Sequence, residues 1–327
     1  MSDREDFSMR FRIALGLLVL GVAPAWAEVP RVAASIAPVQ SLVASVMGDL
    51  GTPALIVSSG ASPHGYALKP SQARSLQDAA LVVWVGPALE TFLVAPLERL
   101  SPQAKRLALT SLPGVRLLPL RQGGDWEPHD HEHDHETGAA DHEEHDHDDD
   151  HDHEAGGIDP HLWLDPTNAQ VLVGAVADAL ADLDPEHAPT YRANAAATKT
   201  RLEGLDRALQ ERLAPVRGRS FLVFHDGYQY LEARYGLTGV GAITLHPETP
   251  PGAQRMRQIR ERLKTQGVAC IFAEPQFSPA MVHTVAEGTP AHTSTLDPLG
   301  AAHPPGPALY EQTLNDLGRA LAECLTP

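Results

Sequence analysis

Two series of short apolar runs, each alternating with segments of helical periodicity, limit the folds open to this chain. The run at residues 80–85, Ala-Leu-Val-Val-Trp-Val, is apolar without a break, as in parallel strands covered on both faces. The first series has apolar runs at 32–36, 54–57, 80–85 and 106–109 and helical segments at 39–47, 69–79 and 87–99; the second has apolar runs at 219–224, 240–244, 268–273 and 293–296 and helical segments at 252–266, 278–287 and 307–325. Alternating strands and helices favour right-handed parallel crossovers, so we expect an α/β protein with two mainly parallel sheets, each flanked by helices.

Helical segments at residues 166–182 and 185–213 separate the two series. In the longer segment, four leucines from Leu202 to Leu213 lie three or four residues apart and form one apolar stripe. Its roughly 28 residues would extend about 40 Å. An ordinary packed helix would also show this stripe, but a place midway between the two series favours one long rigid connector. The expected domains are an N-terminal domain at 28–182, a linking helix at 183–214 and a C-terminal domain at 215–327.

Residues 1–27 have the features of a cleaved export signal. Two arginines precede an apolar run, and Ala25-Trp26-Ala27 is a small-x-small cleavage site, so we expect cleavage after Ala27. The residues before Met9 are mixed in charge, which suits the start of a signal poorly, so either Met1 or Met9 is the true start. The apolar run is shorter than the roughly 20 residues that cross a bilayer, and we expect the processed protein to be soluble.

Much of the negative charge lies in one segment, residues 125–154. The formal net charge of the chain is −17, and this segment holds 15 of the 42 acidic residues and no Lys or Arg. The rest is nearly neutral and carries no basic footprint, which excludes nucleic acid as a partner. With few apolar side chains to bury, the segment is expected to be a disordered loop. Its closely spaced histidines predict weak, auxiliary metal binding, whereas the alternative is a solvated acidic linker. These histidines are His129, His131, His133, His135, His142, His145, His147, His151 and His153.

Three further histidines lie in short segments far apart in the chain. His161 lies between the pairs Asp159-Pro160 and Asp165-Pro166, and proline restricts the residue before it, so we expect a short extended segment between two rigid corners. His64 follows the second strand of the first series, and His225 follows the first strand of the second series. One buried histidine is more often a core residue. Three from distant loops, two of them beyond the carboxyl ends of strands, predict a divalent-metal site in the cleft between the domains.

The chain has two cysteines, Cys270 and Cys324. An exported chain enters an oxidising compartment, so we expect them to form a disulfide that fastens the C-terminal helix to a strand. A thiolate metal site is the alternative, but the wide spacing and the lack of a CxxC pair argue against it.

Five short motifs occur in a fixed order along the chain. They are Gly60-Ala61-Ser62-Pro63-His64, His161-Leu162-Trp163-Leu164-Asp165-Pro166, Phe224-His225-Asp226, Phe272-Ala273-Glu274-Pro275-Gln276-Phe277 and Thr295-Leu296-Asp297-Pro298-Leu299-Gly300. With a histidine-rich segment between the first two, they resemble the ZnuA-type zinc-binding proteins of bacterial ABC importers, within the TroA-like family of metal receptors. The likeness covers essentially the whole mature chain.

This resemblance implies a high-affinity zinc receptor in the periplasm. Such a receptor would capture Zn²⁺ and deliver it, as a monomer, to an inner-membrane ABC permease with a cytoplasmic ATPase. The resemblance also implies a disulfide between Cys270 and Cys324.

The zinc ligands that the resemblance implies are His64, His161 and His225. The fourth ligand is either Asp297 or a water molecule, because Pro63 stands where some members have an acidic residue directly before the first histidine. Manganese and iron receptors of the wider group usually have a carboxylate at the place of His225, and a third imidazole favours zinc.

Each coordinating ring also needs an acceptor for its second nitrogen, and Asp226, Asp165 and nearby carbonyls are candidates. Because the rings must be deprotonated to bind metal, we expect the affinity to fall steeply below about pH 6.

Other functions are open to the same set of residues. A zinc hydrolase also uses three histidines, but the sequence has no GxSxG turn and no glutamate beside a ligand histidine. Glu274 is the one candidate base, and it lies in a motif shared with the receptors, so we expect no enzyme. A periplasmic zinc buffer, an adhesin, or a manganese or iron receptor could use the same fold.

Deleting residues 125–154 should lower the number of zinc ions bound and leave the tightest site intact, because the segment is expected to collect zinc at low affinity. Titration of the full-length and deleted proteins with Zn²⁺ gives both quantities. Loss of the tightest site on deletion would contradict this division of roles.

Overall fold

Two four-stranded parallel sheets, one in each half of the chain, form the framework of the protein. The computed structural model describes residues 29–121, 157–244, 247–248 and 251–326. The strands are β1 (Val32–Ala34), β2 (Ala54–Leu55), β3 (Leu81–Trp84), β4 (Lys105–Ala108), β5 (Ser220–His225), β6 (Thr238–Thr244), β7 (Cys270–Ala273) and β8 (His292–Thr295). The strand orders are β2-β1-β3-β4 and β6-β5-β7-β8, with every neighbouring pair parallel.

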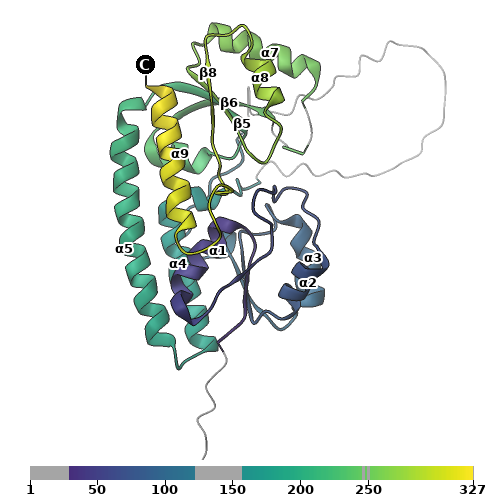
Figure 1. The fold of residues 1–327 in the computed structure, drawn as a ribbon, viewed down its shortest axis with the longest axis vertical. Coiled ribbons are helices and arrows are strands. Elements are labelled where there is room, and N and C mark those ends of the chain that lie inside the picture. The colour runs from purple at the N-terminus through teal and green to yellow at the C-terminus, as the bar shows by residue number, and fades with distance from the viewer. Residues whose placement is uncertain (1–28, 122–156, 245–246, 249–250, 327) are drawn as a thin grey trace, which may run out of the picture.

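Helices flank both sheets, which confirms the predicted α/β fold, and a long helix lies between the two sheets in the order of the chain (Figure 1). They are α1 (Ala37–Met47), α2 (Pro70–Gln77), α3 (Val94–Leu100), α4 (Pro166–Leu183), α5 (Ala188–Leu213), α6 (Gln229–Tyr235), α7 (Ala253–Thr265), α8 (Ala280–Ala286) and α9 (Leu309–Leu325). Strand β3 shows why its sequence lacks alternation. Leu81 and Val83 join the apolar cluster that contains α1, whereas Val82 and Trp84 join the one that contains α2 and α3.

Helix α3 begins later than the sequence predicts. The expected helix at residues 87–99 is preceded by a 3₁₀ turn at Thr91–Leu93, and α3 starts at Val94. The reason is Glu90, whose buried carboxylate accepts hydrogen bonds from the backbone N–H groups of Val85 (3.2 Å) and Gly86 (2.9 Å). The chain therefore turns around this side chain, and burial raises the pKa of Glu90 to about 7.

Helix α6 was not predicted at all. It has seven residues, too few to show a clear helical period. Gly236 ends it in the left-handed conformation (φ 69°), and its backbone N–H bonds to the carbonyl of Glu232. The helix directly follows the segment after His225, so its position matters for the site.

The long helix α5 has 26 residues and packs along α1, α4 and α9. Its predicted leucine stripe is buried, and Figure 1 shows the helix running beside both sheets. Helix α9 joins the same core, and the backbone N–H of Tyr310 near its start donates a 2.9 Å hydrogen bond to the Ser41 hydroxyl oxygen of α1. One large apolar cluster therefore includes residues from both halves.

Several sequence predictions fall outside this description. The export signal at 1–27 and the histidine-rich segment at 125–154 lie among residues that the structure does not describe. The domain limits at 182/183 and 214/215 stay predictions. Within the described ranges, every helix is either too short or too polar to cross a bilayer.

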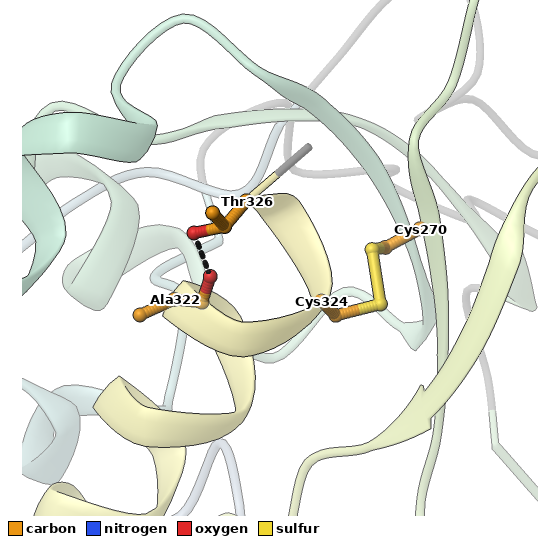
Figure 2. The surroundings of a disulfide bond; sticks show 4 residues. All are labelled: Cys270, Ala322, Cys324 and Thr326. Carbon is orange, nitrogen blue, oxygen red and sulfur yellow. Dashed lines mark hydrogen bonds between the residues drawn. A yellow bond between two sulfur atoms is a disulfide. The ribbon is translucent and has the colours of Figure 1, made fainter.

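The predicted disulfide is present. Cys270, the first residue of β7, is bonded to Cys324 in the last turn of α9, with Cα atoms 6.1 Å apart (Figure 2). Beyond Cys324, the Thr326 hydroxyl donates a 2.6 Å hydrogen bond to the carbonyl of Ala322 and closes the helix end. The bond thus fastens the last helix to the second sheet.

Replacing both cysteines by alanine should lower the free energy of unfolding by about 4 kcal/mol in the chain-entropy model, because the bond closes a long loop. The two cysteines are 54 positions apart. Urea unfolding with and without reductant measures the effect, and the double variant should not respond to reductant. Equal stability of the oxidised and reduced wild type would contradict the prediction.

Candidate metal centre

Three histidines from three separate segments lie together in one pocket. His64 is in the loop between β2 and α2, His161 precedes a 3₁₀ turn at Leu162–Leu164, and His225 ends β5. The ring centroids are 5.5 Å apart for His64 and His161, 5.5 Å for His64 and His225, and 5.0 Å for His161 and His225. One nitrogen of each ring lies within 4.8 Å of the others. The structure thus brings together the three rings that the sequence predicts to converge.

The segment around His161 is not extended, as the two Asp-Pro pairs predicted, but forms the 3₁₀ turn. Each proline restricts only the residue before it, so the residues between the prolines remain free to turn. Asp159 holds the histidine in place, because its Oδ1 accepts hydrogen bonds from the backbone N–H (3.0 Å) and from ring Nδ1 (2.8 Å) of His161. Because Nδ1–H donates a hydrogen bond to the carboxylate, the other nitrogen of the neutral ring, Nε2, carries the lone pair.

Glu274 holds His225 in the same way. It follows β7, the neighbour of β5, so both side chains lie at the carboxyl edge of the second sheet. Glu274 Oε1 is 2.6 Å from His225 Nδ1, and both side chains are almost fully buried. Burial by itself would lower the pKa of His225, but the Glu274 carboxylate outweighs this effect and the pKa is raised. The orienting roles of Glu274 and Asp159 were missed from sequence, although Asp159 lies only two residues from its histidine.

The Nε2 atoms of His161 and His225 face each other at 3.1 Å. Because both Nδ1 protons point to carboxylates, two lone pairs meet at this distance and repel unless a proton or a metal ion lies between them. Gly227 makes the close approach possible, since a Cβ atom there would lie 2.7 Å from His225 Nε2. This part of the pocket is therefore arranged to receive a cation.

Asp297, one of the two candidates for the fourth ligand, is held by hydrogen bonds from its own loop and from Gln276. Its Oδ1 accepts hydrogen bonds from Gln276 Nε2 (2.8 Å) and from the backbone N–H groups of Leu299 and Gly300 (both 3.1 Å), and its Oδ2 accepts one from Ala301 (2.6 Å). In the part of the chain that the structure describes, the close group of metal donors contains the three histidines without Asp297. To reach a metal, this carboxylate would have to release those hydrogen bonds.

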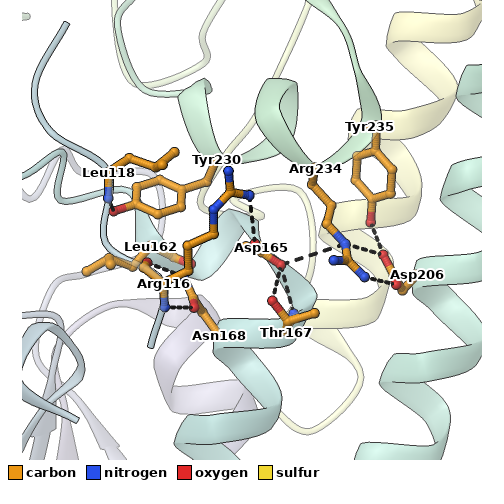
Figure 3. A network of polar contacts seen from close by, with 10 residues as sticks. All are labelled: Arg116, Leu118, Leu162, Asp165, Thr167, Asn168, Asp206, Tyr230, Arg234 and Tyr235. Carbon is orange, nitrogen blue, oxygen red and sulfur yellow. Dashed lines mark hydrogen bonds and ion pairs between the residues drawn. The ribbon is translucent and has the colours of Figure 1, made fainter. Parts of the chain in front are cut away.

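Asp165, one of the candidate partners of the coordinating rings, instead begins α4. Its Oδ1 accepts hydrogen bonds from the backbone N–H (2.9 Å) and the hydroxyl (2.7 Å) of Thr167. Figure 3 shows it within a polar network in which Arg234 of α6 also pairs with Asp206 of α5, and Arg116 lies 4.0 Å from Asp165. The network joins α4, α5 and α6, and the ion pairs and hydrogen bonds of Asp165 within the described residues do not involve a ligand ring.

Asp226, the other candidate, pairs with Arg121 and not with a ring. Its Oδ1 lies 3.0 Å from Arg121 Nη2. Burial raises the pKa of Asp226 to about 7, although Arg121 acts in the opposite direction. This carboxylate therefore belongs to a separate ion-pair group beside the histidines.

Fold and site together define a metal-binding protein in which two parallel α/β halves share one buried histidine site. The model of the family described as "Zinc-uptake complex component A periplasmic" matches residues 32–324. The chain belongs to this family.

Named relatives and a solved structure agree with this assignment. A Brucella suis protein named "High-affinity zinc uptake system protein ZnuA" is 44% identical over 305 residues, which cover 90% of this chain and 91% of the relative. A Paracoccus denitrificans protein of the same name is 42% identical over 321 residues, covering 97% and 98%. The structure described as "Crystal structure of ZnuA" is 26% identical with a TM-score of 0.73, and the match covers 91% of this chain and 99% of that chain.

Replacing Glu274 by glutamine should weaken Zn²⁺ binding about 10- to 100-fold, because the His225 ring loses the carboxylate that fixes its orientation and raises its basicity. Competition with a chelator at pH 7.5 measures the affinity. Glu98→Gln, at an exposed position of α3, is the control and should bind like the wild type. Equal affinity of all three proteins would contradict the role of Glu274.

Proposed function

We propose that this protein is the zinc receptor of an ABC importer and that His64, His161 and His225 bind the transported Zn²⁺. The observation that carries the ligand assignment is the 3.1 Å approach of the two Nε2 atoms, with His64 completing the group. Two nitrogens on one tetrahedral zinc ion lie about 3.3 Å apart, as Zn–N distances of about 2.0–2.1 Å require. The family description and the names of the relatives support zinc as the cargo.

The charges around the pocket support a divalent cation. Three neutral imidazoles would leave a bound Zn²⁺ with its full charge, which is unfavourable in a buried site. Asp159 and Glu274, behind two of the rings, supply two negative charges. Asp159 Oδ2 and Glu274 Oε2 have no hydrogen-bond partner within the described ranges, so part of each carboxylate's charge is not neutralised by a donor. We therefore propose that these two carboxylates supply compensating charge, whether or not Asp297 also joins the metal.

We also propose where and with which partners the receptor acts. Export with cleavage after Ala27 would place it in the periplasm, in agreement with the periplasmic family description. It would act there as a monomer. There it would deliver zinc to an inner-membrane permease driven by a cytoplasmic ATPase. The role is that of a binding protein with no catalytic step. The close packing of α5 and α9 across both halves favours small shifts on binding over wide hinge closure.

His225→Ala should weaken the tightest zinc site by more than about 100-fold, because only two of three protein ligands remain. His187→Ala is the matched control, since His187 pairs with Asp184 at the turn between α4 and α5. Calorimetric titration with Zn²⁺ compares the variants. An unchanged tight site in His225→Ala would refute the ligand assignment.

Zinc affinity should also fall as the pH drops through the pKa of His225, which Glu274 raises above its ordinary value of 6.5. Protons and zinc compete for the same Nε2, and below this pKa the ring is an imidazolium that cannot coordinate. Titration at pH 7.5 and pH 5 tests this. Similar dissociation constants at both values would argue against imidazole ligands.

A further inference from the structure

Arg121 forms a buried ionic bridge between the two halves of the protein. Its Nη1 and Nη2 donate to the two carboxylate oxygens of Glu232, each at 2.9 Å, and Nη2 also lies 3.0 Å from Asp226 Oδ1. The side chains are 13% (Arg121), 8% (Glu232) and 15% (Asp226) exposed. A two-pronged guanidinium contact of this kind fixes both distance and orientation.

The two partners of Arg121 lie in the chain segment that follows His225. Asp226 directly follows this histidine, and Glu232 lies in α6, the next helix along the chain. The Glu232 carboxylate fits against Gly239 of β6, where a Cβ atom would lie 2.6 Å from Oε1. The second half therefore has a space shaped for this carboxylate.

Arg121 itself ends a segment that is hydrogen-bonded to the segment carrying Asp159, the residue that orients His161. The Leu120 backbone N–H bonds to the Gly157 carbonyl (2.8 Å), and the Asp159 N–H bonds to the Leu118 carbonyl (2.9 Å). The segment that ends at Arg121 is thus paired with the segment that carries Asp159, the carboxylate that holds His161. Tyr230 of α6 also joins these two segments. Its hydroxyl accepts a hydrogen bond from the Leu118 backbone N–H (2.8 Å) and donates one to the Asp159 carbonyl (3.1 Å).

We propose that Arg121 is a positioning residue for zinc retention. It holds the loop after His225 against the paired segments 118–121 and 157–159, which support His161. This inference rests on the proposed function of the three histidines. Without the guanidinium, Asp226 and Glu232 would be two buried carboxylates that repel each other next to His225, and the spacing of the two Nε2 atoms would no longer be fixed. Affinity differences between closely related complexes lie mostly in the dissociation rate, so we expect the loss in zinc release.

The test is the rate of zinc release from the processed full-length protein, measured by stopped flow after mixing with excess chelator. Arg121→Gln should release zinc about 10- to 100-fold faster, the range for loss of groups that support metal ligands, with little change in the association rate. Arg121→Lys should recover part of the loss, because one ammonium group cannot form the two-pronged contact. Glu232→Gln should act in the same direction and more weakly, and it decides the question if Arg121→Gln does not fold.

Arg234→Gln is the matched control. Arg234 lies in α6 and pairs with Asp206 of α5 and, at 3.9 Å, with Asp165 at the start of α4; within the described ranges, its ion-pair partners include no ligand histidine. It should lower stability to urea without changing the zinc release rate. Wild-type release rates in both Arg121→Gln and Glu232→Gln, or equal acceleration in Arg234→Gln, would overturn the inference. If His225→Ala abolishes tight binding in the same series, the ligand assignment survives that failure; if His225→Ala retains it, the proposed function itself fails.

Discussion

Two carboxylate–imidazole hydrogen bonds determine what the pocket can bind. Asp159 and Glu274 each accept a hydrogen bond from the Nδ1–H of a histidine. The Nε2 lone pairs of His161 and His225 therefore point toward one another. The same carboxylates supply the negative charge that a buried divalent ion requires. Orientation and charge compensation therefore come from one pair of residues, and the three rings would be a poor metal site without them.

The fold places these groups by a general property of parallel sheets. Glu274 and His225 end neighbouring strands, so both lie at the same carboxyl edge of the second sheet. The N-terminal half supplies His64 from the loop after β2, and the buried turn before α4 supplies His161. A shared apolar core, with α5 and α9 packed across both halves, keeps these segments in register.

The sequence was informative where one local pattern decides the structure and less so where distant residues decide it. Unbroken apolar runs such as β3 located the parallel strands, and the turns around His64, His161 and His225 indicated the site. Helix α6 was missed because seven residues carry too little periodicity. The partner of His225 could not be inferred, because Glu274 is 49 positions away and only the strand order places it there. For the fourth ligand the sequence left Asp297 and a water molecule as alternatives, and it could not show the four hydrogen bonds that Asp297 accepts from Gln276 and from its own loop.

The contact between Glu274 and His225 also restricts how such a protein can evolve. Exchanging His225 for a carboxylate, the kind of ligand that harder metals prefer, would by itself place two acidic groups side by side in a buried pocket. A shift in metal preference would thus require both positions to change together, or the first substitution would yield a poorly folded intermediate. The glutamate that tunes this histidine acts as a barrier between one cargo and another.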